Sequence, residues 1–254
     1  MHLTETCEVD APRIITHVET TSASTPDGQS LTPIHEDLKA IDLLPSDHLV
    51  DTGYVDAELL LTSQDEYHVN LVGPTMHDTG WQARQPNPSF TSKDFQIDWA
   101  RQQATCPAGK TSQFWTPATD TRGNPIIQIK FAKRECRACL LQPQCTHANP
   151  PRRTITVRPE AQHKALLVAR EREQTPAFIQ QYARRAGIEG TLSYGVRMFD
   201  LRRARYLGLA KTHLQHLLMA AAMNLIRVVR WLAGVPVAQA RPSAFARLYP
   251  IAAT

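Results

Sequence analysis

Hydrophobic and polar positions at the start of the chain follow the pattern of short strands. Residues 2–24 are rich in Thr, Ile and Val and are interrupted at Asp10–Pro12, which predicts two strands joined by a turn. A polar loop follows over residues 24–30. Thr32-Pro33 then supplies an N-cap and a first-turn proline, so we expect a helix through about Ile41.

The same alternation of short strands and helices continues to residue 74. We expect a strand over His48–Val50, a helix over Val55–Ser63 and a second strand over Tyr67–Val72. This order is typical of a mixed α/β layer fold. The first of these strands ends at Asp51, and strand ends are where such folds expose catalytic groups. The alternative for Asp51 is an ordinary turn aspartate beside Gly53.

The texture changes over residues 75–149, where Pro, Gly and Trp are frequent and helical periodicity is absent. The short runs FQIDW and IIQIKF favour strands, so we expect an insertion with its own small sheet. Four cysteines lie here with the spacing C-x29-C-x2-C-x5-C: Cys106, Cys136, Cys139 and Cys145. Together they could form an all-sulfur zinc site, with His147 as a substitute ligand and Cys7 uninvolved. Buried reduced cysteines are the alternative.

The last third of the chain has helical patterns. Helices are expected over residues 159–173 and, after the Thr175-Pro176 cap, to about Ala186. A long apolar face then keeps helical spacing, and we expect it to be core. His213 and His216 are interpreted as structural or solvent-facing. The face consists of Tyr206, Leu209, Ala210, His213, Leu214, Leu217, Leu218, Ala221, Ala222, Leu225, Ile226 and Val229.

Charge is divided unequally between the two parts of the chain. Residues 1–100 hold 4 Lys/Arg and 17 Asp/Glu, a net charge of −13, whereas residues 101–254 hold 24 and 7, a net charge of +17. Such asymmetry suggests nucleic acid as the partner of the basic part, and a basic surface without a ligand is the alternative. No apolar run is long enough for a membrane span, and no signal peptide is evident, so we expect a cytoplasmic protein.

A single acid, Glu189, lies between Gly187 and Gly190, two glycines that permit close approach of a neighbouring backbone. Many bases surround it in the sequence. This arrangement fits a polyanion bound by the bases and a cation held by the acid. The candidate DNA-binding residues are Tyr182, Arg184, Arg185, Arg197, Arg202, Arg203, Arg205 and Lys211.

These residues resemble the motifs of a known family. The run Y-x2-R-x3-E, at Tyr182, Arg185 and Glu189, resembles the C-terminal signature of insertion-sequence DDE transposases. The phrase VDTGYVDAELL around Asp51 is similar to their second-aspartate motif. The cysteine-bearing insertion, followed by IEG and LRRARYLGLAKTHLQH, is similar to one bacterial branch of the family. The resemblance covers about residues 1–233.

The resemblance implies a fold and a chemistry. The fold would be α/β, an RNase H-like mixed sheet flanked by helices, with the β-rich cysteine-containing region inserted. Three carboxylates would hold two Mg²⁺ ions for displacement at phosphorus, and Asp51 and Glu189 would be the second and third of them. Tyr182 and Arg185 would lie near the cleaved DNA strand.

The sequence departs from the family pattern at two points. The final signature lysine falls on Val196, and Arg197 is expected to serve instead. The first aspartate of the family would lie on a strand upstream of Met1–Val18, so the chain is expected to begin inside the catalytic domain. Asp10, in a turn, is a poor replacement for that ligand.

The predicted organisation has four parts. Residues 1–74 form the N-terminal part of the catalytic domain, 75–158 the insertion, 159–233 the C-terminal helical part and 234–254 a tail. We expect a transposase that acts on DNA at the nucleoid, truncated and catalytically impaired. A non-catalytic nucleic-acid-binding remnant, containing zinc in one version, and an unstable fragment are the alternatives. The oligomeric state stays open, with a homodimer on DNA as one possibility.

Overall fold

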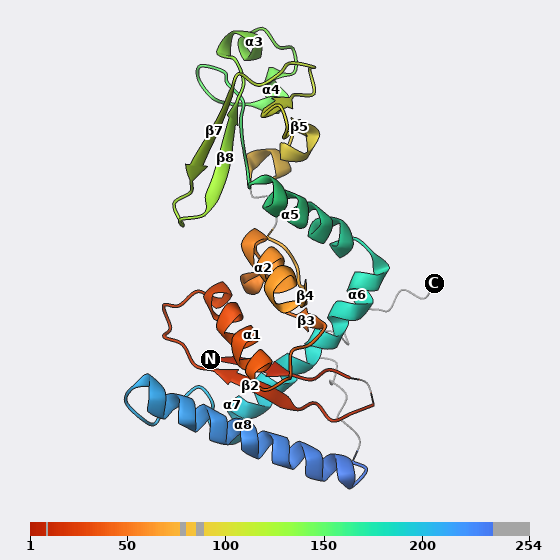
Figure 1. Cartoon of the computed structure of the whole chain (residues 1–254), viewed down its shortest axis with the longest axis vertical. Coiled ribbons are helices and arrows are strands. Elements are labelled where there is room, and N and C mark those ends of the chain that lie inside the picture. Colours follow the sequence, from red (N-terminus) through yellow and green to blue (C-terminus); the bar gives the residue numbers. More distant parts are fainter. Residues whose placement is uncertain (9, 77–79, 85–88, 236–254) are drawn as a thin grey trace, which may run out of the picture. The chain divides into compact units, whose positions relative to one another are not determined.

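The computed structural model describes residues 1–8, 10–76, 80–84 and 89–235 (Figure 1). Two compact units divide the chain. The first contains Met1–Ser22 together with the residues from Gly187 onward, and the second contains Ala23–Ala186. Each unit is described below by itself. The expected tail falls largely on residues 236–254, which lie outside the described residues.

The first unit combines a strand pair with two helices. Strands β1 (His2–Glu5) and β2 (Ile15–Glu19) are antiparallel, with Leu3 opposite Val18, so the predicted pair of strands is confirmed. Helix α7 (Ala186–Phe199) leads into α8 (Leu209–Leu232), which packs against β2. The buried core consists of Ile15, Val18, Ala220 and Met223.

The predicted core face of α8 is wrong. Its leucines at 214, 217, 218 and 225 are between 41% and 66% exposed, whereas Gln215, His216, Ala220 and Met223 are buried. Hydrogen bonds between α8 and β2 explain this orientation. Asn224 accepts a hydrogen bond from the Ile15 N–H and donates one to the Ile15 carbonyl, both at 2.8 Å. Because buried backbone groups must find partners, this pairing turns the face that carries Asn224 toward β2.

The second unit begins with a parallel β-α-β arrangement. A 3-10 turn η1 (Asp27–Ser30) precedes α1 (Leu31–Ala40). Strand β3 (Asp47–Leu49) then pairs in parallel with β4 (Asn70–Val72), and between them lie the 3-10 turn η2 (Thr52–Tyr54) and α2 (Ala57–Tyr67). The core under these elements consists of Leu31, Val50, Val55 and Leu71.

Two predicted helix boundaries in this region are wrong. Helix α1 begins at Leu31 after Ser30, so Thr32 is inside the helix and is not its N-cap. Helix α2 runs to Tyr67 and ends at His68 in the left-handed region (φ 56°), which shortens the expected strand to Asn70–Val72. Its start is set by Asp56, whose carboxylate accepts the N–H groups of Glu58 and Leu59 and satisfies donors that the helix leaves free.

A β-rich region occupies the middle of the second unit. Strands β5 (Gln96–Asp98) and β6 (Gln103–Thr105) form one antiparallel pair. Strands β7 (Phe114–Thr119), β8 (Pro125–Lys130) and β9 (Thr154–Val157) form a three-stranded sheet. The short helices α3 (Lys133–Arg137) and α4 (Gln142–Cys145) connect β8 to β9, as Figure 1 shows in green. The core is formed by Phe95, Ala104, Ile129, Phe131, Ile155 and Val157.

Two further 3-10 turns, η3 (Trp81–Arg84) and η4 (Ser92–Asp94), precede this region, and helices close the unit. Helix α5 (Glu160–Glu173) packs against α2, and Arg172 donates hydrogen bonds to Asn70 at 2.7 Å and to the Leu71 carbonyl at 2.6 Å. Helix α6 (Pro176–Tyr182) is capped by Thr175, which accepts the Phe178 N–H. The 3-10 turn η5 (Ala183–Arg185) follows. The predicted helix over 159–173 and the predicted cap are confirmed.

The fold is mixed α/β. The described strands form four separate small sheets, with two, two, two and three strands. An RNase H-like sheet, and the division of the chain at residues 74 and 158, therefore stay predictions.

Candidate functional site

Asp51 lies two residues after the end of the parallel strand β3, at the start of η2. Its Oδ1 accepts the N–H of Thr52 at 2.8 Å, so it is the N-cap of that turn. Its Oδ2 lies 3.3 Å from Nη2 of Arg185, and 58% of the Asp51 side chain is exposed. Asp51 is thus a turn aspartate, which was the alternative interpretation, and its carboxylate also faces the Arg185 guanidinium and solvent.

Two residues of the Y-x2-R-x3-E run lie in the second unit with Asp51, and Arg185 contacts its carboxylate. The Arg185 guanidinium lies over the Tyr182 ring, 5.9 Å from its centroid. The Tyr182 ring stacks on Phe178 with 5.5 Å between centroids and an angle of 7°. Phe178 is buried, so the stack anchors Arg185 to α6. Arg185 of this run therefore contacts Asp51, a contact that the sequence did not predict.

Tyr54 and Asp27 are functional candidates that the sequence pattern did not indicate. Burial is the main cause that raises the pKa of Tyr54 to about 12, and Asp27 and Asp51 add to it while Arg185 opposes it. The Tyr54 hydroxyl is therefore protonated at neutral pH and can donate a hydrogen bond. Asp27 packs against Gly53, where its carboxylate lies 3.0 Å from the position of an added Cβ. A shared pattern with Asp51 was not visible because the two residues belong to different turns.

Glu189 lies in the first turns of α7, in the first unit, and is exposed. Asp51 belongs to the second unit, so the convergence of the two carboxylates stays a prediction. The glycines beside Glu189 do not interrupt the helix. A side chain at Gly187 would collide with the guanidinium of Arg13, so this glycine admits a neighbouring side chain where backbone approach was expected. An added Cβ at Gly190 would meet open space.

The loop between α7 and α8 exposes three arginines, Arg202, Arg203 and Arg205. Its backbone is fixed by the buried Gln215, which accepts the Arg205 N–H at 3.0 Å and donates to the Arg203 carbonyl at 2.9 Å. The loop is thus held in place through its main chain while its side chains stay exposed. We call these three residues the arginine loop. Gln215 was missed because a glutamine on a helix carries no pattern that identifies a loop clamp.

The other predicted DNA-binding residues are exposed but less organised. Arg184 and Lys211 are exposed, and so is Arg197. The Nε of Arg197 donates to the Ser193 carbonyl of its own helix at 3.3 Å, while the neighbouring Val196 is half-buried. The expected substitution of Arg197 for the signature lysine stays a prediction.

A buried polar network lies beneath α7 and α8 in the first unit. Arg227 pairs with Glu5 at 3.0 Å and donates to the Arg13 carbonyl at 2.9 Å. Thr191 donates to Glu5 at 2.6 Å and also contacts Arg227. The side chain of Glu5 is 5% exposed. This network connects β1 to the helix that carries Glu189, two residues before Thr191.

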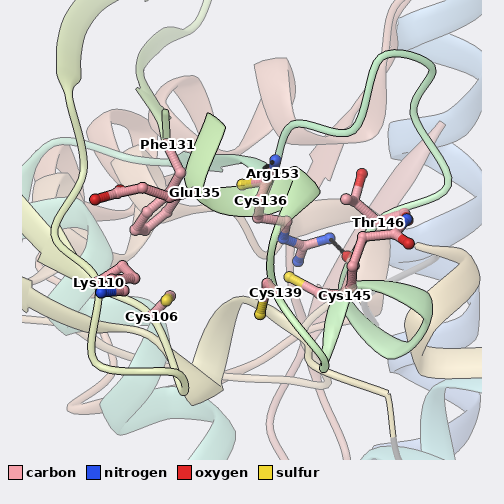
Figure 2. Close-up of a pocket in the computed structure, with 10 residues that line it drawn as sticks. Cys106, Lys110, Phe131, Glu135, Cys136, Cys139, Cys145, Thr146 and Arg153 are labelled. Carbon is pink, nitrogen blue, oxygen red and sulfur yellow. Dashed lines mark hydrogen bonds between the residues drawn. The ribbon is translucent and has the colours of Figure 1, made fainter. Parts of the chain in front are cut away.

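The four cysteines of the β-rich region line one open cavity of about 30 Å³ (Figure 2). The cavity is also lined by Arg153, Lys110 and Glu135. The four cysteines are half-buried and form no disulfide. His147 is not part of the lining, and its ring stacks on Trp81 with centroids 3.7 Å apart. Cys7 lies in the other unit.

Comparisons with known proteins give one match. A family model described as a transposase DDE domain matches residues 105–229. This segment includes Glu189, the Y-x2-R-x3-E run and the four cysteines, while Asp51 lies outside it. No curated protein and no solved structure matches the chain. Among the described residues, no helix is both long and apolar enough to cross a membrane.

Proposed function

We propose that the chain is a DDE transposase that cuts and joins DNA strands in the transposition of an insertion sequence, because a family model described as a transposase DDE domain matches residues 105–229. One observation carries the proposal. Arg185, from the Y-x2-R-x3-E run, pairs with Asp51 at the end of β3. Two motifs far apart in the sequence thus meet at one exposed carboxylate, which supports the assignment of Asp51 although it lies outside the matched segment.

Asp51 and Glu189 fit the magnesium that the family uses. Both are exposed carboxylates, and hard oxygen ligands are what Mg²⁺ requires. The ion pair with Arg185 supports this fit, since it shows that the Asp51 carboxylate faces a cationic group. When bound, a pair of magnesium ions would stabilise charge on the attacking and leaving oxygens at phosphorus.

The remaining site residues would bind and orient DNA. The Arg185 guanidinium lies over the Tyr182 ring, and a guanidinium matches phosphate oxygens through two parallel hydrogen bonds. Tyr54 offers a protonated hydroxyl close to the same carboxylate. The arginine loop adds charge that binds the phosphate backbone without reading base sequence.

The proposal includes impaired cleavage by the 254-residue polypeptide alone. Two of the three family carboxylates match residues of this sequence, at positions 51 and 189. Phosphoryl transfer depends on positioning and charge stabilisation, so a missing ligand should remove most of the rate. Asp10 is exposed in a bend of the first unit and is not favoured as the third ligand.

A second candidate function is nucleic-acid binding without catalysis, with zinc as a structural metal. The observations that favour it are the arginine loop, which needs no metal to bind phosphate, and the cysteine-lined cavity. In either function DNA would place the protein at the nucleoid. A homodimer on DNA belongs to the transposase proposal, since strand transfer must bring two element ends together.

A cleavage assay separates these functions. The probe is a supercoiled plasmid that carries the gene with its flanking DNA, incubated with Mg²⁺ and either the 254-residue chain or a chain extended by the upstream coding sequence. We expect little cleavage by the first and cleavage by the second. Asp51→Asn and Glu189→Gln should each abolish cleavage in the extended chain while binding persists. Asp65→Asn, an exposed acid on α2, is the matched control and should cleave normally.

Three results would contradict parts of the proposal. Cleavage that survives Asp51→Asn or Glu189→Gln would mean that these acids do not hold the magnesium. Binding without cleavage by both chains would favour the second candidate. Efficient cleavage by the 254-residue chain would refute impairment and would return Asp10 to consideration.

A further inference from the structure

The cysteine-lined cavity brings together residues from three separate stretches of chain. Cys106 follows β6 and Cys136 belongs to α3, while Cys139 lies between α3 and α4 and Cys145 is the last residue of α4. In Figure 2 the four side chains surround the same opening. The antiparallel hairpin β7–β8 returns the chain from the neighbourhood of Cys106 to that of Cys136, so the long gap in the spacing is closed by tertiary structure.

Hydrogen bonds order the backbone around the cysteines. The N–H of Gly109 donates to the Cys106 carbonyl at 2.8 Å, and Gly109 has a φ of 72°, which glycine adopts without strain. The N–H of Cys139 donates to the Cys136 carbonyl at 3.4 Å, and the Arg153 N–H donates to Cys136 Sγ at 3.5 Å. In such turns the backbone carbonyls are already hydrogen-bonded, and backbone N–H groups are available to stabilise negative charge on a thiolate.

Arg153 fixes a positive charge at the wall of the cavity. It is 9% exposed and donates to the carbonyls of Cys145 and Phe90 at 3.0 and 3.1 Å. Its guanidinium also lies 5.2 Å from the Phe95 ring centroid. Lys110 is a second cation of the lining. Two cations partly balance the net negative charge that four thiolates and a divalent ion would carry, with Glu135 acting against them.

The burial of the cysteines argues against ordinary core thiols. Their neighbours Ile129 and Phe131 are 0% and 2% exposed, while all four cysteines are only half-buried and face the cavity.

The sulfur atoms are not yet at bonding distance from a common ion. Within the part of the chain that the structure describes, no three of the four Sγ atoms lie within 4.8 Å of one another. A tetrahedral site with Zn–S bonds of about 2.3 Å needs sulfur atoms about 3.8 Å apart. Binding would therefore draw the turns inward and tie β6 to the segment between β8 and β9.

We propose that Cys106, Cys136, Cys139 and Cys145 bind one Zn²⁺ ion that holds the β-rich region together. His147 and Cys7 take no part. The proposal does not depend on the transposase activity, because the ion would be structural. Asp51 is distant from the four cysteines in the sequence and does not line their cavity. Binding to this site stabilises the folded form, since thiolate ligands couple metal affinity to folding.

The test uses the full chain purified without chelator. Elemental analysis should find about one zinc per chain, at least tenfold less zinc in Cys136→Ser and an unchanged amount in Cys7→Ser. Cobalt replacing zinc should give the thiolate charge-transfer and tetrahedral d–d bands of a four-sulfur site. Alkylation of the native wild-type chain, mapped by mass spectrometry, should label Cys7 and spare the other four until a chelator is added. This last measurement needs no variant and so does not depend on a variant that folds.

Three outcomes would overturn the proposal. They are five thiols that alkylate freely with no zinc present, zinc retained in full by Cys136→Ser, and disulfides among the four cysteines in freshly purified protein. Because each readout is independent of DNA cleavage, a negative cleavage assay leaves this result unaffected.

Discussion

Neutralising the arginine loop is expected to weaken DNA binding without unfolding the protein. In the variant Arg202→Gln, Arg203→Gln and Arg205→Gln, the clamp by Gln215 persists because it uses main-chain atoms. Arg203 forms an ion pair with Asp200 at 3.9 Å, with side chains 77% and 51% exposed. Exposed pairs of this kind contribute little to stability, so the thermal midpoint should stay close to that of the wild type.

The magnitude follows from counterion release. Each phosphate contact adds about 0.9 to the slope of log affinity against log salt concentration, so three lost contacts should reduce the slope by about 2.7. Between 50 and 200 mM salt the wild type should then lose about 40-fold more affinity than the variant. The difference in slope reports contacts to phosphate directly, whereas a single affinity at one salt concentration does not.

The assay is fluorescence anisotropy with a labelled duplex of arbitrary sequence over this salt range. The matched control changes three exposed arginines of the β-rich region, Arg101→Gln, Arg122→Gln and Arg134→Gln, which alters net charge equally. We expect its slope to differ from the wild type by much less. Equal slopes for the wild type and the loop variant, with both folded, would show that the arginine loop is not the footprint of DNA.

Two further predictions concern stability. Glu5→Ala removes a carboxylate that is 5% exposed from its pair with Arg227, which is 19% exposed, so the free energy of unfolding in urea should fall by about 1.5–3 kcal/mol; a loss below about 0.5 kcal/mol would refute the contribution of this pair. His35 is buried, hydrogen-bonded to His48 at 3.0 Å, and desolvation lowers its pKa to about 4. Between pH 6.5 and 4 the unfolded chain therefore binds a proton at His35 that the folded chain does not bind. The free energy of unfolding should drop by up to about 3 kcal/mol over this range. The variant His35→Gln should lose this part of the pH dependence.

Elements whose signals are local were predictable from the sequence. The Thr175-Pro176 cap begins α6 because the threonine hydroxyl accepts an N–H only three residues away. The alternation of β1 and β2 is also local. Asp56 caps α2 by the same chemistry. The helix ends only at His68, which takes a left-handed conformation, and so it runs past its expected end at Ser63. Such conformations have weak sequence signals outside glycine.

The orientation of α8 shows where local signals fail. Its leucines predict a buried face, yet burial is decided by what the partner strand requires. The main-chain N–H and carbonyl of Ile15 need hydrogen-bond partners, and Asn224 supplies both. The sequence contains the asparagine and the leucines, but the choice between them depends on the strand edge that the helix meets.

The candidate site divides along the same line. Residue types and motif spacing by themselves determined which acids, arginines and cysteines are candidates, because carboxylates suit magnesium and thiolates suit zinc wherever they lie. Only the tertiary structure decided that Arg185 contacts Asp51 and that Cys106 shares a cavity with the other cysteines. Contacts between residues so distant in sequence are formed by strand pairing and helix packing, and no local pattern records which partners those interactions bring together.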